Sequence, residues 1–146
     1  MELILFHSIV TFILLGLILV VQVVHYPYFS FTDNNNAINA FKFHQQRIGY
    51  VVVPLMISEL VSGIYLSFKM WSPFWQIQLI NLSLIFIIWF HTFLIMVPLH
   101  NQLTQEPTPI IIKALVKQNW IRTFAWSVKA LLCALILWHL IGVSHG

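Results

Sequence analysis

The sequence predicts an all-α integral membrane protein folded as an up-down bundle of four transmembrane helices. Of its 146 residues, 60% are hydrophobic and 8% are charged, and the mean hydropathy is +0.88. Soluble domains carry about 25% charged residues, so a composition this apolar belongs to the membrane class. A helix needs about 20 mostly apolar residues to cross a bilayer. Four stretches reach that length: residues 3–24, 48–68, 77–98 and 121–143.

The first apolar stretch is expected to be a retained span. The chain opens with MELILFHSIVTF, which lacks the positively charged start of a secretory signal peptide, and no small-residue cleavage site follows. Pro27 comes directly after the stretch and is expected to end the helix there. The segments that connect consecutive spans allow those spans to pack side by side in antiparallel directions. Residues 1–146 are therefore expected to form a single membrane domain.

The distribution of basic residues predicts which way the bundle faces. Loops rich in lysine and arginine remain on the cytoplasmic side of a membrane. We therefore expect the first and third connections to be cytoplasmic and both termini to lie on the opposite, non-cytoplasmic side. Those two connections and the helix starts that follow them hold five of the seven basic residues: Lys42, Arg47, Lys113, Lys117 and Arg122.

Composition also argues against two classes of partner or site. The formal charge of +3 is spread thinly along the chain, so no basic patch indicates a nucleic-acid partner. Cys133 is the single cysteine and lies in an apolar run. It therefore has no partner for an internal disulfide and no companions for a cysteine-based zinc site.

Polar residues gather at the predicted cytoplasmic ends of all four spans. Because neighbouring ends meet in an antiparallel bundle, these side chains are expected to share one rim. Imidazole binds zinc, copper and iron, so three of them are candidate metal ligands: His25, His44 and His100. The wider candidate set for a cofactor is His25, His44, Arg47, His91, His100, Asn119 and Arg122. The alternative is that each histidine is an interfacial residue solvated at a helix end.

A second polar layer lies deep within the predicted spans. It contains Glu59, His91 and Lys129, and an ionisable side chain at such depth is costly and needs a partner. We expect Glu59 to pair with Lys129, with His91 within reach of both. The pair is either a structural contact that fixes which helices meet or part of a proton relay. His91 is either a hydrogen-bonding residue between helices or a haem or quinone ligand.

A thinner polar layer lies near the opposite end of the bundle. His7 belongs to the first span and His139 to the last. In a simple bundle these spans are neighbours, so the two histidines are candidate axial ligands of a haem. The alternative is that each side chain reaches the membrane surface by itself.

Three segments together resemble a group of small four-span bacterial membrane proteins. They are QVVHYPYF after the first span, FHQQRIGYVVVPLMISEL at the second and VKQNWIRTFAW before the fourth. The resemblance covers nearly the whole chain. It implies a location in the bacterial inner membrane, and no activity is established for that group.

The chain resembles the anthrone-oxygenase-like membrane domain family more distantly. Asn119 and Arg122 match an Asn-x-x-Arg-like element before the last span of that family, and His44 matches a histidine at its second span. The layout is also similar to that of the four-span protoporphyrinogen oxidase type. The characteristic opening of that type, a histidine followed by Trp-Phe-Ala-Gly-Leu, is absent from this chain.

Three functions are compatible with these patterns. The rim favours a membrane protein, in one version an oxidoreductase, that binds haem, a metal ion or a quinone-like ring. Its arginines would neutralise anionic groups of the ligand. A small chain whose aromatic faces meet the bilayer also fits a non-enzymatic accessory subunit of a larger membrane complex. A third candidate is a proton or solute conductor that uses Glu59, His91 and Lys129. Four spans are few for a conductor, so that version requires a homo-oligomer.

Overall fold

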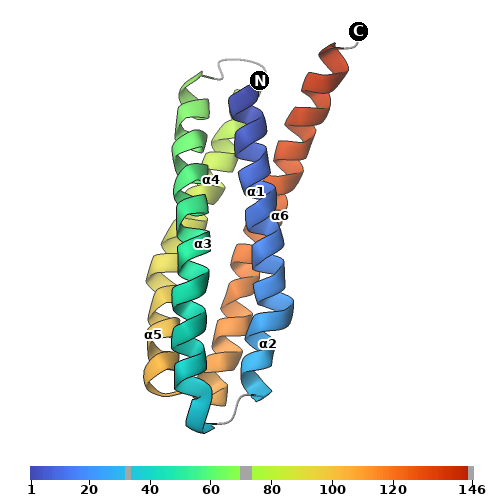
Figure 1. Cartoon of the computed structure of the whole chain (residues 1–146). Coiled ribbons are helices and arrows are strands. Elements are labelled where there is room, and N and C mark those ends of the chain that lie inside the picture. The colour runs from blue at the N-terminus through green and yellow to red at the C-terminus, as the bar shows by residue number, and fades with distance from the viewer. Residues whose placement is uncertain (32–33, 70–73, 145–146) are drawn as a thin grey trace.

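The computed structural model describes residues 1–31, 34–69 and 74–144, which form four long helical rods (Figure 1). No strand occurs among these residues. The first rod consists of α1 (Glu2–Val20), a π-helical turn (Val21–His25), α2 (Tyr26–Tyr28) and a 3-10 turn (Phe29–Phe31). The second is α3 (Asn34–Lys69). The third consists of α4 (Trp75–His91), a second π-helical turn (Thr92–Met96) and α5 (Val97–Gln105). The fourth is α6 (Pro109–Ser144).

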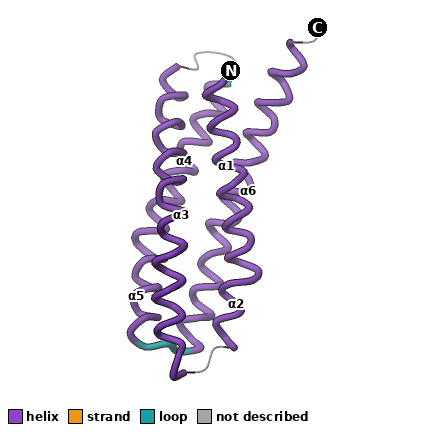
Figure 2. Tube along the Cα trace, in the orientation of Figure 1, coloured by secondary structure: helices purple, strands orange, loops and turns teal. Residues whose placement is uncertain are grey.

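The rods run up and down, and each packs against two neighbours. α1 contacts α3 and α6, and α4 contacts the same two helices, so α3 and α6 lie diagonally across the bundle. The tube trace shows the four rods side by side, with the last part of α6 leaning away from the others (Figure 2).

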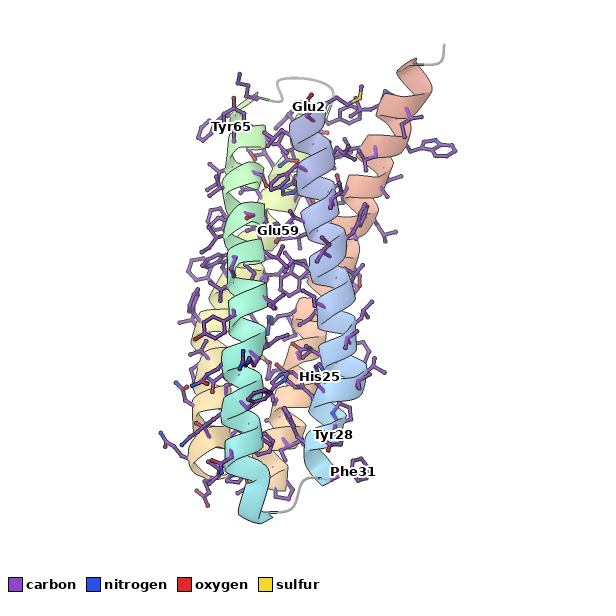
Figure 3. The ribbon with its side chains drawn as sticks, in the orientation of Figure 1. Glu2, His25, Tyr28, Phe31, Glu59 and Tyr65 are labelled. Atoms are coloured by element: carbon purple, nitrogen blue, oxygen red, sulfur yellow. The ribbon has the colours of Figure 1, made fainter. Side chains whose placement is uncertain are left out.

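The two ends of the bundle differ in chemistry. Glu2 and Tyr65 mark the end at which both termini lie, which we call the termini end (Figure 3). His25, Tyr28 and Phe31 mark the other, which we call the histidine end.

All four predicted spans coincide with helices that are long and apolar enough to cross a membrane. By length and composition these segments are Glu2–Tyr28, Ile38–Lys69, Trp75–Gln105 and Pro109–Gly142. The all-helical, four-rod architecture expected from the sequence is therefore confirmed.

The helices continue further at the histidine end than the hydropathy pattern indicates. α3 begins at Asn34 instead of residue 48, and α6 begins at Pro109 instead of residue 121. Each has 36 residues, which at about 1.5 Å per residue exceeds the bilayer core of about 30 Å. Hydropathy finds only the apolar part of a helix, whereas backbone hydrogen bonding continues through polar turns.

Pro27 does not end its helix as expected, and Pro98, the last residue of the third predicted span, does not end its helix either. Pro27 and Pro98 each lie two residues after a π-helical turn. A proline ring clashes with the carbonyl four residues earlier, and in both cases that carbonyl belongs to the π turn. The wider turn accommodates the ring, and the rod continues.

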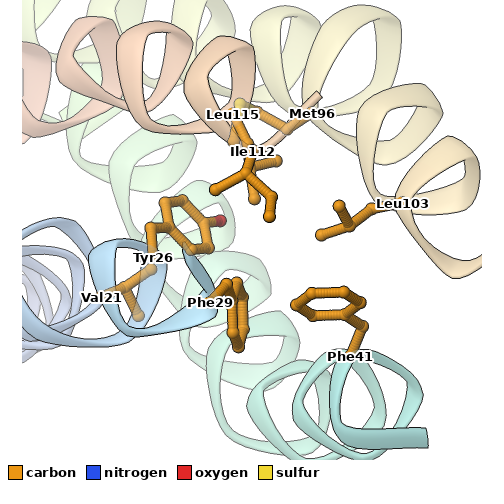
Figure 4. Packing of buried hydrophobic residues seen from close by; sticks show 8 residues of the cluster. All are labelled: Val21, Tyr26, Phe29, Phe41, Met96, Leu103, Ile112 and Leu115. Carbon is orange, nitrogen blue, oxygen red and sulfur yellow. The ribbon is translucent and has the colours of Figure 1, made fainter. Parts of the chain in front are cut away.

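Two clusters of buried hydrophobic residues hold the bundle together. The middle cluster consists of Val10, Leu14, Ile18, Met56, Ile88, Ala125 and Trp126. The cluster at the histidine end, shown in Figure 4, consists of Val21, Tyr26, Phe29, Phe41, Met96, Leu103, Ile112 and Leu115. The second cluster draws on the helical extensions, and burying each large apolar side chain contributes about 1.5–3 kcal/mol relative to water. The extensions are thus packed parts of the fold.

Candidate functional site

Tyr26 is the centre of a hydrogen-bonded group at the histidine end. Its side chain is buried, and its hydroxyl lies 3.0 Å from Nε2 of His100. The Arg122 guanidinium interacts electrostatically with this hydroxyl. If Arg122 donates to the tyrosine oxygen, the tyrosine O–H is free to donate to His100. The first, third and fourth rods thereby meet at one phenol.

A second set of hydrogen bonds fixes Arg122 from the other side. Asn119 is fully buried, and its Nδ2 donates to Oε1 of Gln22 at 2.7 Å. Arg122 donates to Oδ1 of Asn119 at 3.4 Å, and Gln22 donates to the carbonyl of Val116 at 3.2 Å. The predicted pair Asn119 and Arg122 therefore belongs to the site, with Gln22 as a partner from the first rod.

The three candidate metal-binding histidines gather near Tyr26. The His44 ring lies 5.1 Å from the His25 ring and 6.3 Å from the Tyr26 ring, between centroids. The metal-site prediction nevertheless stays a prediction. No group of three or more His, Cys, Asp or Glu side chains in the described part of the chain is arranged to hold a metal ion. Nε2 of His100 is already occupied by the tyrosine hydroxyl.

Two other candidates lie outside this group. Arg47 is exposed, and its guanidinium lies 5.2 Å from the ring centroid of Phe43 on the same helix. His91 is buried, but its Nε2 lies 3.3 Å from Oε1 of Gln118 and not beside the Glu59–Lys129 pair. A π turn separates His91 from His100. The depth of His91 and the direction of its side chain therefore differ from those expected for a regular α-helix.

A cavity of about 140 Å³ lies beside this group. All four rods line it, and both π-helical turns contribute, through Val21 on one side and Thr92 and Met96 on the other. Half-exposed Val53 and Val97 also line it, so the cavity reaches the outer surface of the bundle. Its polar lining consists of Tyr26, His44, Gln45, Thr92, His100 and Arg122.

Three buried polar atoms of the cavity-lining residues have no hydrogen-bond partner among the described residues. They are Nε2 of His44, Oγ1 of Thr92 and Nε of Arg122. Buried polar atoms are nearly always hydrogen-bonded, to protein, water or ligand. The three atoms belong to cavity-lining residues of three different rods.

The cavity is closer in size to a single aromatic ring than to haem. A cavity of about 150 Å³ accommodates a benzene molecule, and a porphyrin has four pyrrole rings. His7 and His139, the other predicted ligands of a haem, contact different neighbours in this structure, and their haem ligation stays a prediction. Nδ1 of His7 lies 2.8 Å from the Ser62 hydroxyl, whereas the exposed His139 packs its ring on Phe74 at 5.0 Å. Each histidine therefore has its own partner.

The predicted pairing of Glu59 with Lys129 is present, nearer the centre of the bundle. Nζ of Lys129 lies 3.1 Å from Oε1 of Glu59, and both side chains are almost completely buried. The distance is that of an ion pair, although the angle is too poor for a hydrogen bond. Thr11 donates to Oε1 of Glu59 at 2.8 Å, and the Trp126 indole N–H donates to Oε2 at 3.3 Å.

Sequence reasoning did not identify several residues of the site. Trp126 joins the ion pair to the cavity, since its ring lies 5.3 Å from the Arg122 guanidinium. Thr92 and Met96 lie in an apolar run that looks like ordinary lipid-facing sequence. Pro98, six residues after Thr92, was the sequence signal that could have identified these residues, because a proline within a helix indicates a distorted turn.

Comparisons with known proteins do not add to this picture. No protein-family model, curated protein or solved structure matches the chain. The resemblances drawn from the three sequence segments therefore stay predictions.

Proposed function

We propose that this chain is an integral membrane protein that binds a single-ring, lipophilic ligand with hydrogen-bonding oxygens, of the quinone class. The observation that carries the proposal is the cavity at the histidine end. It has room for about one aromatic ring and brings Tyr26 and His100 together with three unpartnered polar atoms. An enclosed apolar pocket with a few convergent polar groups is the usual form of a small-molecule site.

Membrane insertion is supported by the outer surface of the rods. Large apolar side chains such as Leu94, Phe124 and Trp138 are each at least 71% exposed. Soluble proteins rarely expose broad apolar surfaces, whereas a bilayer solvates them. The basic residues Lys42, Lys113 and Lys117 are exposed on the helical extensions at the histidine end, which favours a cytoplasmic histidine end.

The lining of the cavity favours a ring with polarised oxygens. Its wall is mostly apolar and includes Ile18, Met56 and Met96, which suits a ring and the start of a hydrocarbon tail. Arg122 favours an oxygen that carries partial or full negative charge. The opening beside Val53 and Val97 would admit a ligand from the apolar phase.

The Tyr26–His100 pair gives such a ligand a route for protons. Its 3.0 Å contact leads from the buried phenol to a half-buried imidazole near the end of the bundle. A neutral imidazole has one nitrogen that donates a proton and one that accepts a proton. A ring oxygen in the cavity would therefore be able to exchange a proton with the histidine end while the rest of the ring stays dry.

Binding of a short-tailed benzoquinone to the protein in lipid nanodiscs tests this proposal. Trp126 lines the cavity, so we expect saturable quenching of tryptophan fluorescence. Arg122→Met should weaken the affinity at least tenfold. Thr92→Val should weaken it about two- to tenfold, since one hydrogen bond contributes about 0.5–1.5 kcal/mol.

Arg47→Met is the matched control, because Arg47 is an exposed arginine at the same end of the bundle. The Arg47→Met variant should bind the benzoquinone with the same affinity as the wild type. Non-saturable quenching, or equal affinities for the wild type and Arg122→Met, would contradict the proposal. The purified protein is also expected to show no Soret band.

A further inference from the structure

A row of polar side chains runs through the bundle from the termini end to the cavity. The interior of a helix bundle within a membrane is normally apolar, and ionisable residues there usually mark ion or proton pathways. The row passes the predicted ion pair near its middle. Its buried members are Gln78, Asn81, His7, Ser62, Thr11, Glu59, Lys129, Arg122 and Tyr26, and it ends at the half-buried His100.

The part of the row nearest the termini end is polar but incompletely paired. Gln78 donates to the carbonyl of Gly63 at 3.2 Å, and His7 contacts Ser62 at 2.8 Å. Asn81 is completely buried, and neither Nδ2 nor Oδ1 has a partner among the described residues. Nε2 of His7 likewise has no hydrogen-bond partner among the described residues. Bridging water is the usual partner of such atoms.

The ion pair continues the row toward the cavity. Ser62 donates to the backbone carbonyl of Glu59 at 3.2 Å, so the two side chains lie one helical turn apart. Thr11 and Lys129 then contact Oε1 of Glu59. A pair that served only to join α3 with α6 would not need the polar side chains of Ser62 and His7 on its termini side.

The cavity forms the last part of the row. Lys129 and Arg122 are seven residues apart on α6, which is about 10 Å along the helix, and Trp126 lies between them. Arg122 and Tyr26 both line the cavity, and Tyr26 contacts His100. Polar side chains therefore occur at successive levels from the termini end to the histidine end.

We propose that this row conducts protons across the bundle and that Glu59 is its essential carrier. Each step breaks one O–H or N–H bond of a bridging water, hydroxyl or titratable side chain and forms another on the next such group. The amides of Gln78 and Asn81 hydrogen-bond the water and do not relay protons themselves. No electron moves and no co-reactant is consumed. The fixed charge of Arg122 opposes the passage of cations, so conduction is slow compared with that of an open channel.

Proton flux into liposomes tests this inference. The protein is reconstituted in vesicles that contain a pH-sensitive dye, with valinomycin and potassium to balance charge. No quinone is added, so the outcome is independent of the proposed ligand. We expect a pH gradient to decay faster than in protein-free vesicles, and Glu59→Gln to remove at least nine-tenths of that excess rate.

Two further variants keep the test interpretable if Glu59→Gln does not fold. Glu59→Gln combined with Lys129→Met removes both charges and should also lose the flux. His7→Gln retains a side chain that hydrogen-bonds Ser62 but does not relay protons, so we expect a partial loss. Glu106→Gln changes an exposed carboxylate and should leave the flux unchanged.

Two results would overturn the inference. One is a wild-type rate equal to that of protein-free vesicles. The other is a wild-type rate that folded Glu59→Gln or the folded double variant retains. Either result would leave Glu59 and Lys129 as a structural pair, without bearing on whether the cavity binds a quinone.

Discussion

At the scale of single residues, Tyr26 organises the histidine end. Its phenol hydroxyl contacts His100 on the third rod and interacts electrostatically with Arg122 on the fourth. It also stands at the edge of the cavity. The residue thus joins three roles that sequence patterns treat separately: core packing, helix pairing and ligand contact.

Removing this hydroxyl should destabilise the fold without opening a large cavity. Tyr26→Phe leaves Nε2 of His100 without its partner, and an unsatisfied buried polar group costs about 1–3 kcal/mol. The free energy of unfolding in micelles, measured by denaturant titration, should fall by that amount. Tyr50→Phe is the control, since Tyr50 is 75% exposed and should show no change. Equal stability of both variants would mean that the Tyr26 contacts contribute nothing.

If Glu59 and Lys129 form a buried ion pair, the double variant should be more stable than the single variant Glu59→Gln. Glu59→Gln leaves the Lys129 charge buried, and breaking a buried pair typically costs about 3–5 kcal/mol. Replacing both residues, as Glu59→Gln with Lys129→Met, removes the uncompensated charge and should restore most of that loss. Thermal unfolding of the two variants in the same detergent measures the difference. A double variant no more stable than Glu59→Gln would argue against an ion pair.

At the scale of helices, the two π-helical turns shape the site. Both are adjacent to a proline and both line the cavity. A π turn inserts an extra residue into the helix and is frequent at functional sites. Here the turns redirect Thr92 and Met96 on one rod, and Tyr26 follows directly on the other. The cavity is a consequence of two helices that deviate from regular geometry at the same level.

Close approach of helices near the termini end depends on Gly63. A Cβ atom at this position would lie 2.7 Å from Cδ1 of the fully buried Ile85 and 3.3 Å from Cε1 of His7. Overpacking of this kind costs about 1–3 kcal/mol, so Gly63→Ala should lower the melting temperature. Gly16 is the matched control, because nothing lies within 4 Å of its added Cβ. Gly16→Ala should be neutral or stabilising by about 0.5–1 kcal/mol, and the opposite order would contradict this packing.

The sequence predicts well where the helices lie along the chain. It predicts poorly how each helix is rotated about its own axis. Four apolar stretches were enough to locate the rods, and depth alone correctly paired Glu59 with Lys129. The histidines were expected at one end and do gather there. Arg47, in contrast, lies on an exposed face, and His91 faces Gln118. Periodicity assumes a regular helix, so it does not anticipate a π turn or the side from which a neighbouring rod approaches.

At the scale of the whole molecule, the proposed orientation makes a labelling prediction. Both termini lie at one end of the bundle (Figure 1), and the exposed lysines of the extensions lie at the other. In intact cells a membrane-impermeant maleimide should label Glu2→Cys but not Lys113→Cys. The native Cys133 is buried and should contribute little background. Labelling of Lys113→Cys alone would reverse the orientation.

The central claim is that the cavity holds a single quinone-like ring, and photo-crosslinking tests it most directly. A short-tailed benzoquinone that carries an azide on its ring is irradiated with the protein in nanodiscs, and the modified peptides are identified by mass spectrometry. We predict labelling at cavity-lining residues such as Met56 and Met96, suppressed by excess unmodified quinone and lost in Arg122→Met. Labelling spread over the lipid-facing surface, without competition, would contradict the account.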